Sequence, residues 1–99
     1  MRVDSITISE FKLKIKNESP LIIDIRDRQS YLDSNIPNSK NYDSYGIVNL
    51  DKNNIKEDIV VYCYRGNSSK KVVQFLNQNG FKNVYNLIGG FQAWQENLD

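Results

Sequence analysis

Two short apolar runs have the pattern that is typical of buried strands. Residues 21–25 read Leu-Ile-Ile-Asp-Ile and residues 59–62 read Ile-Val-Val-Tyr, and charged or turn-forming residues flank both runs. Runs of this length that are rich in β-branched residues are typical of strands with both faces covered. Residues 84–87 predict another strand, and weaker patterns predict two more, at residues 5–8 and 40–42.

Segments with helical spacing alternate with these strands. The clearest covers residues 70–79, where four apolar side chains share one side and Gly80 follows as a stop signal. Weaker signals predict further helices from Ser9 as N-cap to Lys16, after Asp27 as N-cap over 28–34, over 44–50, and from Phe91. Strands that alternate with helices predict an α/β fold with a mostly parallel central sheet flanked by helices.

Length and charge are those of one small domain. The chain has 99 residues, and we expect a single domain over residues 1–99. Its 13 basic and 12 acidic residues give a net charge of +1, so neither nucleic acid nor a membrane surface is an expected partner. We also expect no transmembrane segment and no secretory leader, because no apolar stretch is long enough. A lone cysteine forms no internal disulfide, which favours the reducing cytoplasm.

The chain contains no histidine and one cysteine, Cys63. This composition excludes a Cys–His pair, a Ser-His-Asp triad and a zinc site with imidazole ligands. We therefore expect neither a metal nor a cofactor. A nucleophile in this chain would have to be activated by backbone dipoles and cations alone.

Cys63 is the first residue after the strand at 59–62, and a loop of glycine and small polar residues joins it to the next helix. A strand–loop–helix turn directs backbone N–H groups and the positive end of a helix at one point. Such surroundings, helped by Arg65, favour the thiolate, which is the reactive form. An inert buried thiol is the alternative. Lys70 and Lys71 either attract a small anion to the loop or are ordinary solvated lysines.

Four segments resemble one known family. Residues 63–69, Cys-Tyr-Arg-Gly-Asn-Ser-Ser, resemble the active-site loop of the rhodanese-like superfamily, and most of all that of its single-domain bacterial thiosulfate sulfurtransferases. The strand at 21–26 is similar to the Asp-x-Arg strand of this family. Residues 35–39 fall where it carries His-Ile-Pro-Gly-Ala, and residues 87–94 resemble its Gly-Gly-x-x-x-Trp element. The resemblance implies a single rhodanese-like α/β domain.

The sequence departs from the family pattern at several positions. Asn38 replaces the usual glycine of the connecting loop. Ser30 replaces a common glutamate, so an expected ion-pair partner of Arg26 is missing. Ser68 stands where many relatives have Arg or Thr, which leaves Arg65 as the one cation inside the loop.

The resemblance implies a thiosulfate sulfurtransferase without cofactors. Cys63 would take the outer sulfur of thiosulfate, or of another sulfane-sulfur donor, as a persulfide. It would pass that sulfur to cyanide in vitro, or to a thiol acceptor such as thioredoxin or a small thiol. The implied substrate-binding residues are Tyr64, Arg65, Gly66, Asn67, Ser68 and Ser69.

Two other functions remain open. One is a sulfur-relay or sensing rhodanese module that needs a protein partner. The other is a cysteine phosphatase or arsenate reductase, whose loop has the pattern Cys-x5-Arg. Ser69 occupies the position of that arginine, which argues against this second alternative.

Three features outside the loop have two interpretations each. Asp24 and Arg26 end a strand, so they either line the pocket or form a structural ion pair. Gly89 and Gly90 indicate a tight turn between a strand and a helix rather than a phosphate loop, because no Lys-Ser/Thr follows. Tyr64 is either a wall of the pocket or an exposed aromatic side chain of the loop.

Overall fold

The computed structural model describes residues 3–98 and shows a five-stranded parallel sheet in the order β1-β5-β4-β2-β3. The strands are β1 (Ser5–Ile6), β2 (Leu21–Asp24), β3 (Lys40–Asn41), β4 (Ile59–Tyr62) and β5 (Val84–Leu87). β4 is the central strand, and its neighbours β2 and β5 pair with it along its length. The predicted α/β fold with a parallel sheet is confirmed.

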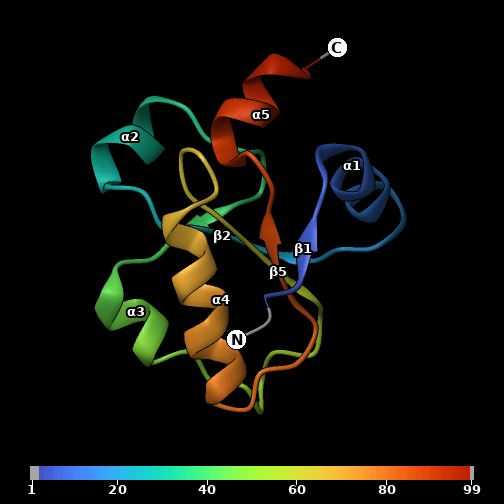
Figure 1. Ribbon diagram of the computed structural model, residues 1–99. Coiled ribbons are helices and arrows are strands. Elements are labelled where there is room, and N and C mark those ends of the chain that lie inside the picture. The colour runs from blue at the N-terminus through green and yellow to red at the C-terminus, as the bar shows by residue number, and fades with distance from the viewer. Residues whose placement is uncertain (1–2, 99) are drawn as a thin grey trace.

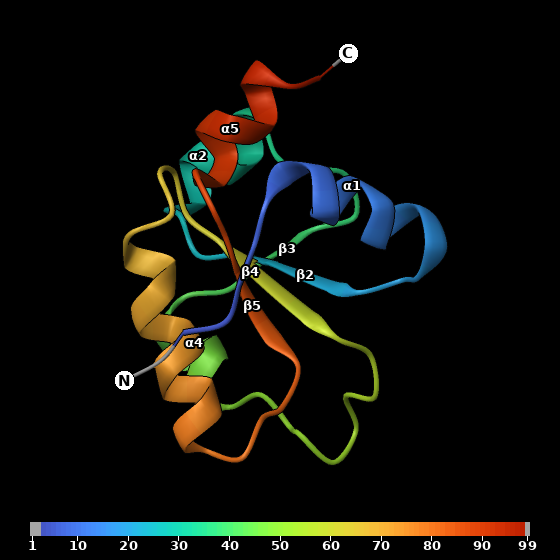
Figure 2. The ribbon, with the colours of Figure 1, turned by 45° about the vertical axis from the view of Figure 1, so that its right-hand side comes forward.

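Helices cover both faces of this sheet (Figures 1 and 2). They are α1 (Ile8–Asn17), α2 (Arg28–Asp33), α3 (Ser44–Val48), α4 (Ser68–Gln78) and α5 (Gly90–Glu96). Side chains of α1 and α5 pack in one hydrophobic cluster, and side chains of α3 and α4 pack in a second cluster on the opposite face. No helix of residues 3–98 has the length and apolar character needed to cross a membrane.

β4 contributes to both clusters because successive side chains of a strand point to opposite faces. Val60 and Tyr62 pack with α1 and α5, whereas Ile59 and Val61 pack with α3 and α4. All four residues are buried. Burial of one such side chain stabilises the fold by roughly 1.5–3 kcal/mol, so the continuous apolar run holds both layers together.

The start of α1 differs from the prediction. Its N-cap is Thr7 and not Ser9, and the preceding strand ends at Ile6. The Thr7 side chain accepts a hydrogen bond from the Glu10 amide, and the Glu10 carboxylate accepts one from the Thr7 amide. This reciprocal pair is the capping box. It satisfies two backbone donors at once, so Thr7 is a more favourable N-cap than Ser9.

Other local predictions are confirmed. The strands at 59–62 and 84–87 have the predicted bounds, and Asp27 caps α2. Gly80 follows α4 with a φ of +89°, as expected of a residue that ends a helix. Asn38 has a φ of +68°. Asparagine tolerates this left-handed conformation better than most residues, which explains how it replaces the usual glycine.

Candidate active site

Cys63 lies at the carboxyl end of β4, in the middle of the sheet. The loop 63–67 leads from this strand into α4 and stands above the helix start in Figure 1. Ligands of open parallel sheets bind beyond the carboxyl ends of the strands. The fold therefore places the single thiol where an α/β protein normally has its site.

The sulfur of Cys63 accepts hydrogen bonds from the loop and from the first turn of α4. The amide nitrogens of Gly66 and Ser69 lie 3.1 and 3.4 Å from Sγ. The Ser69 hydroxyl oxygen lies 3.2 Å from it. Asn67, the N-cap of α4, makes no capping bond with its own side chain. The sulfur thus takes the place that a capping oxygen has in other helices.

These contacts control the ionisation of Cys63, which is only 7% exposed. Burial by itself raises the pKa of the thiol. Hydrogen bonds from the Ser69 hydroxyl and from the amides of Ser69, Gly66 and Arg65 act in the opposite direction, and together they hold the pKa below its ordinary value. The site therefore favours a thiolate without any histidine.

Backbone amides in the first turn of α5 donate hydrogen bonds to carbonyls of the cysteine loop. The Phe91 amide donates to the Cys63 carbonyl and the Gln92 amide donates to the Tyr64 carbonyl, both at 2.9 Å. Gly90 makes this approach possible. A Cβ on Gly90 would collide with the Cys63 carbonyl oxygen and would lie 2.8 Å from the Tyr64 carbonyl carbon. The predicted tight turn is present, and it also serves as the support of the loop.

Cys63 opens into a cavity of about 460 Å³. Four parts of the chain line it: the segment that follows β2, helix α2, helix α5, and the cysteine loop with the start of α4. The lining residues are Ile25, Arg26, Asp27, Ser30, Asp33, Ser34, Cys63, Tyr64, Ser68, Phe91 and Gln95. A larger cavity of about 670 Å³ lies against α3 and α4 and shares only residues 25–27 with it. The larger cavity contains no thiol, so the smaller one is the candidate site.

Arg26 both forms a structural ion pair and lines the cavity. Its Nη2 lies 2.7 Å from Oδ2 of the fully buried Asp24 and donates to the Ser34 carbonyl at 2.6 Å. The guanidinium carbon lies 4.1 Å from the centre of the Phe91 ring. Burial lowers the pKa of Arg26, but the bonds to Asp24 outweigh burial and raise it. Asp24 thus supplies the carboxylate that Ser30 does not.

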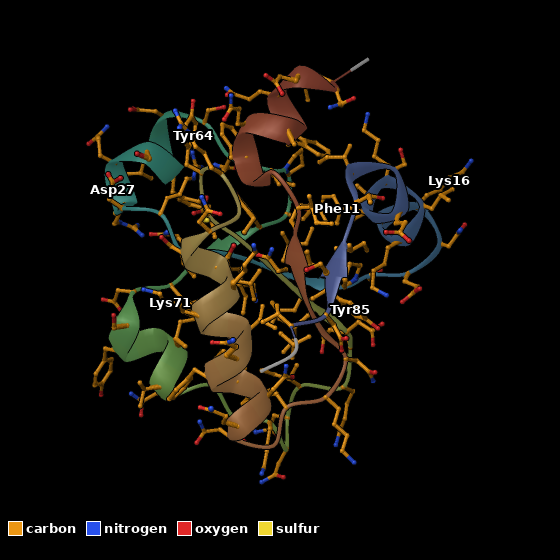
Figure 3. All side chains as sticks on the ribbon, viewed as in Figure 1. Phe11, Lys16, Asp27, Tyr64, Lys71 and Tyr85 are labelled. Carbon is orange, nitrogen blue, oxygen red and sulfur yellow. The ribbon has the colours of Figure 1, made fainter. Side chains whose placement is uncertain are left out.

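The other predicted cations do not line this cavity. Arg65 is exposed, with its guanidinium carbon 5.7 Å from the Tyr64 ring centre, and Lys70 is exposed on α4. Lys71 belongs to the larger cavity, and Figure 3 shows it between α3 and α4. Tyr64 is 48% exposed and also lines the Cys63 cavity, so both interpretations of its position hold. Figure 3 shows Tyr64 near Asp27, above the start of α4.

Asn86 is a buried polar residue of the site that the sequence patterns above did not identify. The Asn86 side chain is fully buried on β5, accepts a hydrogen bond from the Ser69 hydroxyl, and donates to the Gly66 carbonyl at 3.2 Å. A polar residue inside the apolar run Val-Tyr-Asn-Leu was the signal that could have found it. Buried asparagines need partners, and here the partners belong to the cysteine loop.

Comparison with known proteins finds similar sequences and structures over most of this chain. Thiosulfate sulfurtransferase GlpE of Coxiella burnetii is 39% identical to this chain over 82 residues, which span 82% of the chain and 77% of that protein. A rhodanese-like domain protein from Staphylococcus aureus superposes with a TM-score of 0.78 at 33% identity, covering 93% of this chain and 91% of that one.

The fold also extends to distant sequences. The human single-domain sulfurtransferase TSTD1 superposes with a TM-score of 0.84 at 14% identity, and covers 97% of this chain and 98% of that one. At that identity the likeness shows the fold alone. Residues 7–97 match the family described as Rhodanese-like domain. A parallel α/β sheet with a thiol in the loop after its central strand, and sequence matches over most of the chain, show that this protein belongs to the rhodanese-like domain family.

Proposed function

We propose that this chain is a thiosulfate sulfurtransferase that carries sulfane sulfur on Cys63. The observation that supports this most is the convergence of two amides and a hydroxyl on the one thiol, in a loop that ends the central strand. Relatives at 33–39% identity bear the name thiosulfate sulfurtransferase, and this agrees with the proposal.

In the first half-reaction the Cys63 thiolate attacks the outer sulfur of thiosulfate. The sulfur–sulfur bond of thiosulfate breaks, sulfite leaves with the electron pair, and Cys63 becomes a persulfide. In the second half-reaction an acceptor attacks the terminal sulfur, and the thiolate of Cys63 returns as the leaving group. Cyanide as acceptor yields thiocyanate, and a thiol yields a new persulfide. This cycle predicts ping-pong kinetics.

The loop supports both halves of the cycle. The amides that lower the pKa of Cys63 stabilise the thiolate that attacks thiosulfate, and they stabilise the same thiolate when it leaves in the second half-reaction. We assign the sulfonate end of thiosulfate to the mouth of the loop, where the side chain of Arg65 is exposed and able to reach an anion. Lys70 and Lys71 add positive charge to the start of α4, which raises the local concentration of anions.

A phosphatase reaction is not supported. The residue at the sixth position after Cys63 is Ser69, and its hydroxyl oxygen lies 3.2 Å from the sulfur. Cysteine phosphatases use an arginine at this position to bind a tetrahedral oxyanion with two hydrogen bonds. Ser69 is buried and supplies one hydroxyl in place of that guanidinium.

Intact-mass measurement of the purified chain tests the proposal. Thiosulfate without an acceptor should add the mass of one sulfur atom, and cyanide should remove it with release of thiocyanate. The variant Cys63→Ser should keep the fold and form no adduct, because a serine hydroxyl is not ionised at neutral pH. Cys63 is the chain's only thiol, so no other residue can account for the adduct.

The same measurement separates transfer from relay. An adduct that forms from a persulfide donor but not from thiosulfate would contradict the thiosulfate reaction and favour a relay module with a protein partner. Absence of an adduct from both donors, in a folded sample, would contradict both functions.

A further inference from the structure

Asn86 is tied to the cysteine loop through both ends of its amide. Its Nδ2 donates to the Gly66 carbonyl at 3.2 Å, and its Oδ1 accepts from the Ser69 hydroxyl. The bond to Gly66 fixes the orientation of the amide, because a carbonyl accepts and only the nitrogen end can donate to it. The atom that faces Ser69 is therefore an oxygen, which cannot donate.

This orientation determines where the hydrogen of Ser69 points. A serine hydroxyl has one hydrogen to donate and two lone pairs that accept. Because Oδ1 of Asn86 cannot donate, the Ser69 hydrogen lies on the Asn86 side. The short approach of Sγ to the Ser69 oxygen, 3.2 Å, then has to use the hydrogen of the Cys63 thiol. In the thiol form the chain of donors runs from Cys63 to Ser69, from Ser69 to Asn86, and from Asn86 to Gly66.

Ionisation of Cys63 changes this chain of hydrogen bonds. A thiolate has no hydrogen to donate and accepts a hydrogen bond instead, so the Ser69 hydroxyl has to turn toward the sulfur to stabilise it. That rotation leaves the buried Oδ1 of Asn86 without its donor, which is unfavourable in a water-poor interior. The two acceptors, Sγ and Oδ1, therefore compete for one hydrogen.

We propose that Asn86 is a positioning residue that competes with Cys63 for the Ser69 hydroxyl hydrogen and thereby sets the balance between thiol and thiolate. This role of Asn86 rests on the proposed function in one respect, namely that Cys63 is the reactive thiol. Asn86 holds the thiol form, while its bond to Gly66 keeps the loop closed. When the terminal sulfur is bound, Sγ has lost its charge and the Ser69 hydrogen returns to Asn86.

The charged and titratable side chains near the Cys63 sulfur are other residues than Ser69 and Asn86. Among the residues that the structure describes, those that line the cavity of Cys63 are Arg26, Asp27, Asp33 and Tyr64. They come from the segment after β2, from α2 and from the cysteine loop, and no charged residue of β5 is among them. Variants of Asn86 therefore leave these groups in place.

The rate of Cys63 alkylation against pH tests the competition. Asn86→Leu keeps the branching at Cγ and the number of side-chain heavy atoms but has no acceptor, so the Ser69 hydroxyl is free to donate to the thiolate. We expect the midpoint of the profile to fall, with about threefold to tenfold more thiolate at a pH below the wild-type midpoint. Asn86→Ala should shift the midpoint in the same direction. A purely structural role predicts the opposite sign, because a loosened loop loses its amide donors and the midpoint rises.

A double-mutant cycle removes the remaining ambiguity. In a Ser69→Ala background there is no hydroxyl to compete for, so Asn86→Leu should leave the midpoint unchanged. A fall of equal size in that background would overturn the inference. A wild-type midpoint at the ordinary cysteine value would instead count against the proposed function, because Cys63 would then be an ordinary thiol. The two failures are thus distinguishable.

Infrared spectroscopy tests directly whether the Cys63 thiol donates its hydrogen to Ser69. It does not require a variant of Asn86 to fold. A chain with one cysteine has one S–H stretching band. Below the midpoint, the band of the wild type should lie at lower frequency than that of Ser69→Ala, because only the wild type offers the thiol its oxygen acceptor. Equal frequencies would mean that the thiol does not donate to Ser69, and the inference would be wrong.

Discussion

The starts of α1, α2 and α3 differ from the start of α4 in what accepts their free amides. The first three helices are capped by a side-chain oxygen, supplied by Thr7, Asp27 and Asp43. At α4 the side chain of Asn67 caps nothing, and the Ser69 amide points at the sulfur of Cys63 instead. The same kind of backbone donor thus stabilises a helix in three places and a thiolate in the fourth.

The first turns of α1 and α4 also differ in charge. α1 has Glu10 in its first turn, where a negative charge complements the helix dipole. α4 has no acidic residue there, and Lys70 is its third residue. A favourable charge at a helix end is worth about 0.3–1 kcal/mol and an N-cap about 0.5–2 kcal/mol. The buried Val73 and Leu76 offset this loss, since each contributes roughly 1.5–3 kcal/mol.

The largest effect is expected at the contact between α5 and the cysteine loop. Gly90→Ala would place a Cβ against the Cys63 carbonyl and would strain a residue whose φ is +57°. We expect a loss of about 1–3 kcal/mol in the free energy of unfolding, and loss of most sulfurtransferase activity in the protein that still folds. Denaturant unfolding and sulfite release from thiosulfate measure the two effects.

Gly80→Ala is the matched control for this substitution. Gly80 also has a positive φ, +89°, but its nearest neighbours are atoms of the flexible Lys52 side chain. Its replacement should lower stability by about 1–2 kcal/mol and leave turnover of the folded protein intact. Equal loss of turnover in both variants would mean that the support of the loop by α5 is unimportant.

A smaller effect is expected when the exposed cation of the loop is removed. Arg65→Ala should raise the KM for thiosulfate severalfold, up to about tenfold, with a smaller change in kcat, because an anion contact made equally in ground and transition states affects binding alone. The effect should shrink at high salt through screening. Steady-state kinetics at two ionic strengths measures it.

Lys16→Ala removes the same charge from an exposed position on α1 and serves as the control. It should leave both kinetic constants unchanged. An unchanged kcat/KM in Arg65→Ala would move the anion site to Lys70 and Lys71, or to Arg26 inside the cavity.

The smallest effect is expected at an ordinary cap. Thr7→Ala removes the capping box of α1 and should lower the free energy of unfolding by about 0.5–2 kcal/mol. Activity and the alkylation profile of Cys63 should not change, because Thr7 is not among the residues that line its cavity. Urea unfolding, together with the alkylation assay, checks both parts. A shifted alkylation midpoint would show that the start of α1 is coupled to the start of α4.

Features that depend on neighbours in the chain were predictable. The strands at 59–62 and 84–87 followed from short, mainly apolar runs, and the helix stop at Gly80 followed from backbone preference. The position of Cys63 between a strand and a helix followed from the same local patterns. The cap of α1 was misplaced because two residues could serve, and only the reciprocal bonds with Glu10 favour Thr7.

The sequence by itself determined that one thiol, with no histidine to assist it, stands in a loop between a buried strand and a helix. Only the tertiary structure decided what surrounds that thiol. Pairing of β4 with β5 brings Asn86 and Gly90 against a loop more than 15 residues earlier in the chain, and the end of β2 brings Arg26 into its cavity. Contacts of this range arise from strand register and layer packing, because no local propensity specifies which distant backbone a side chain meets.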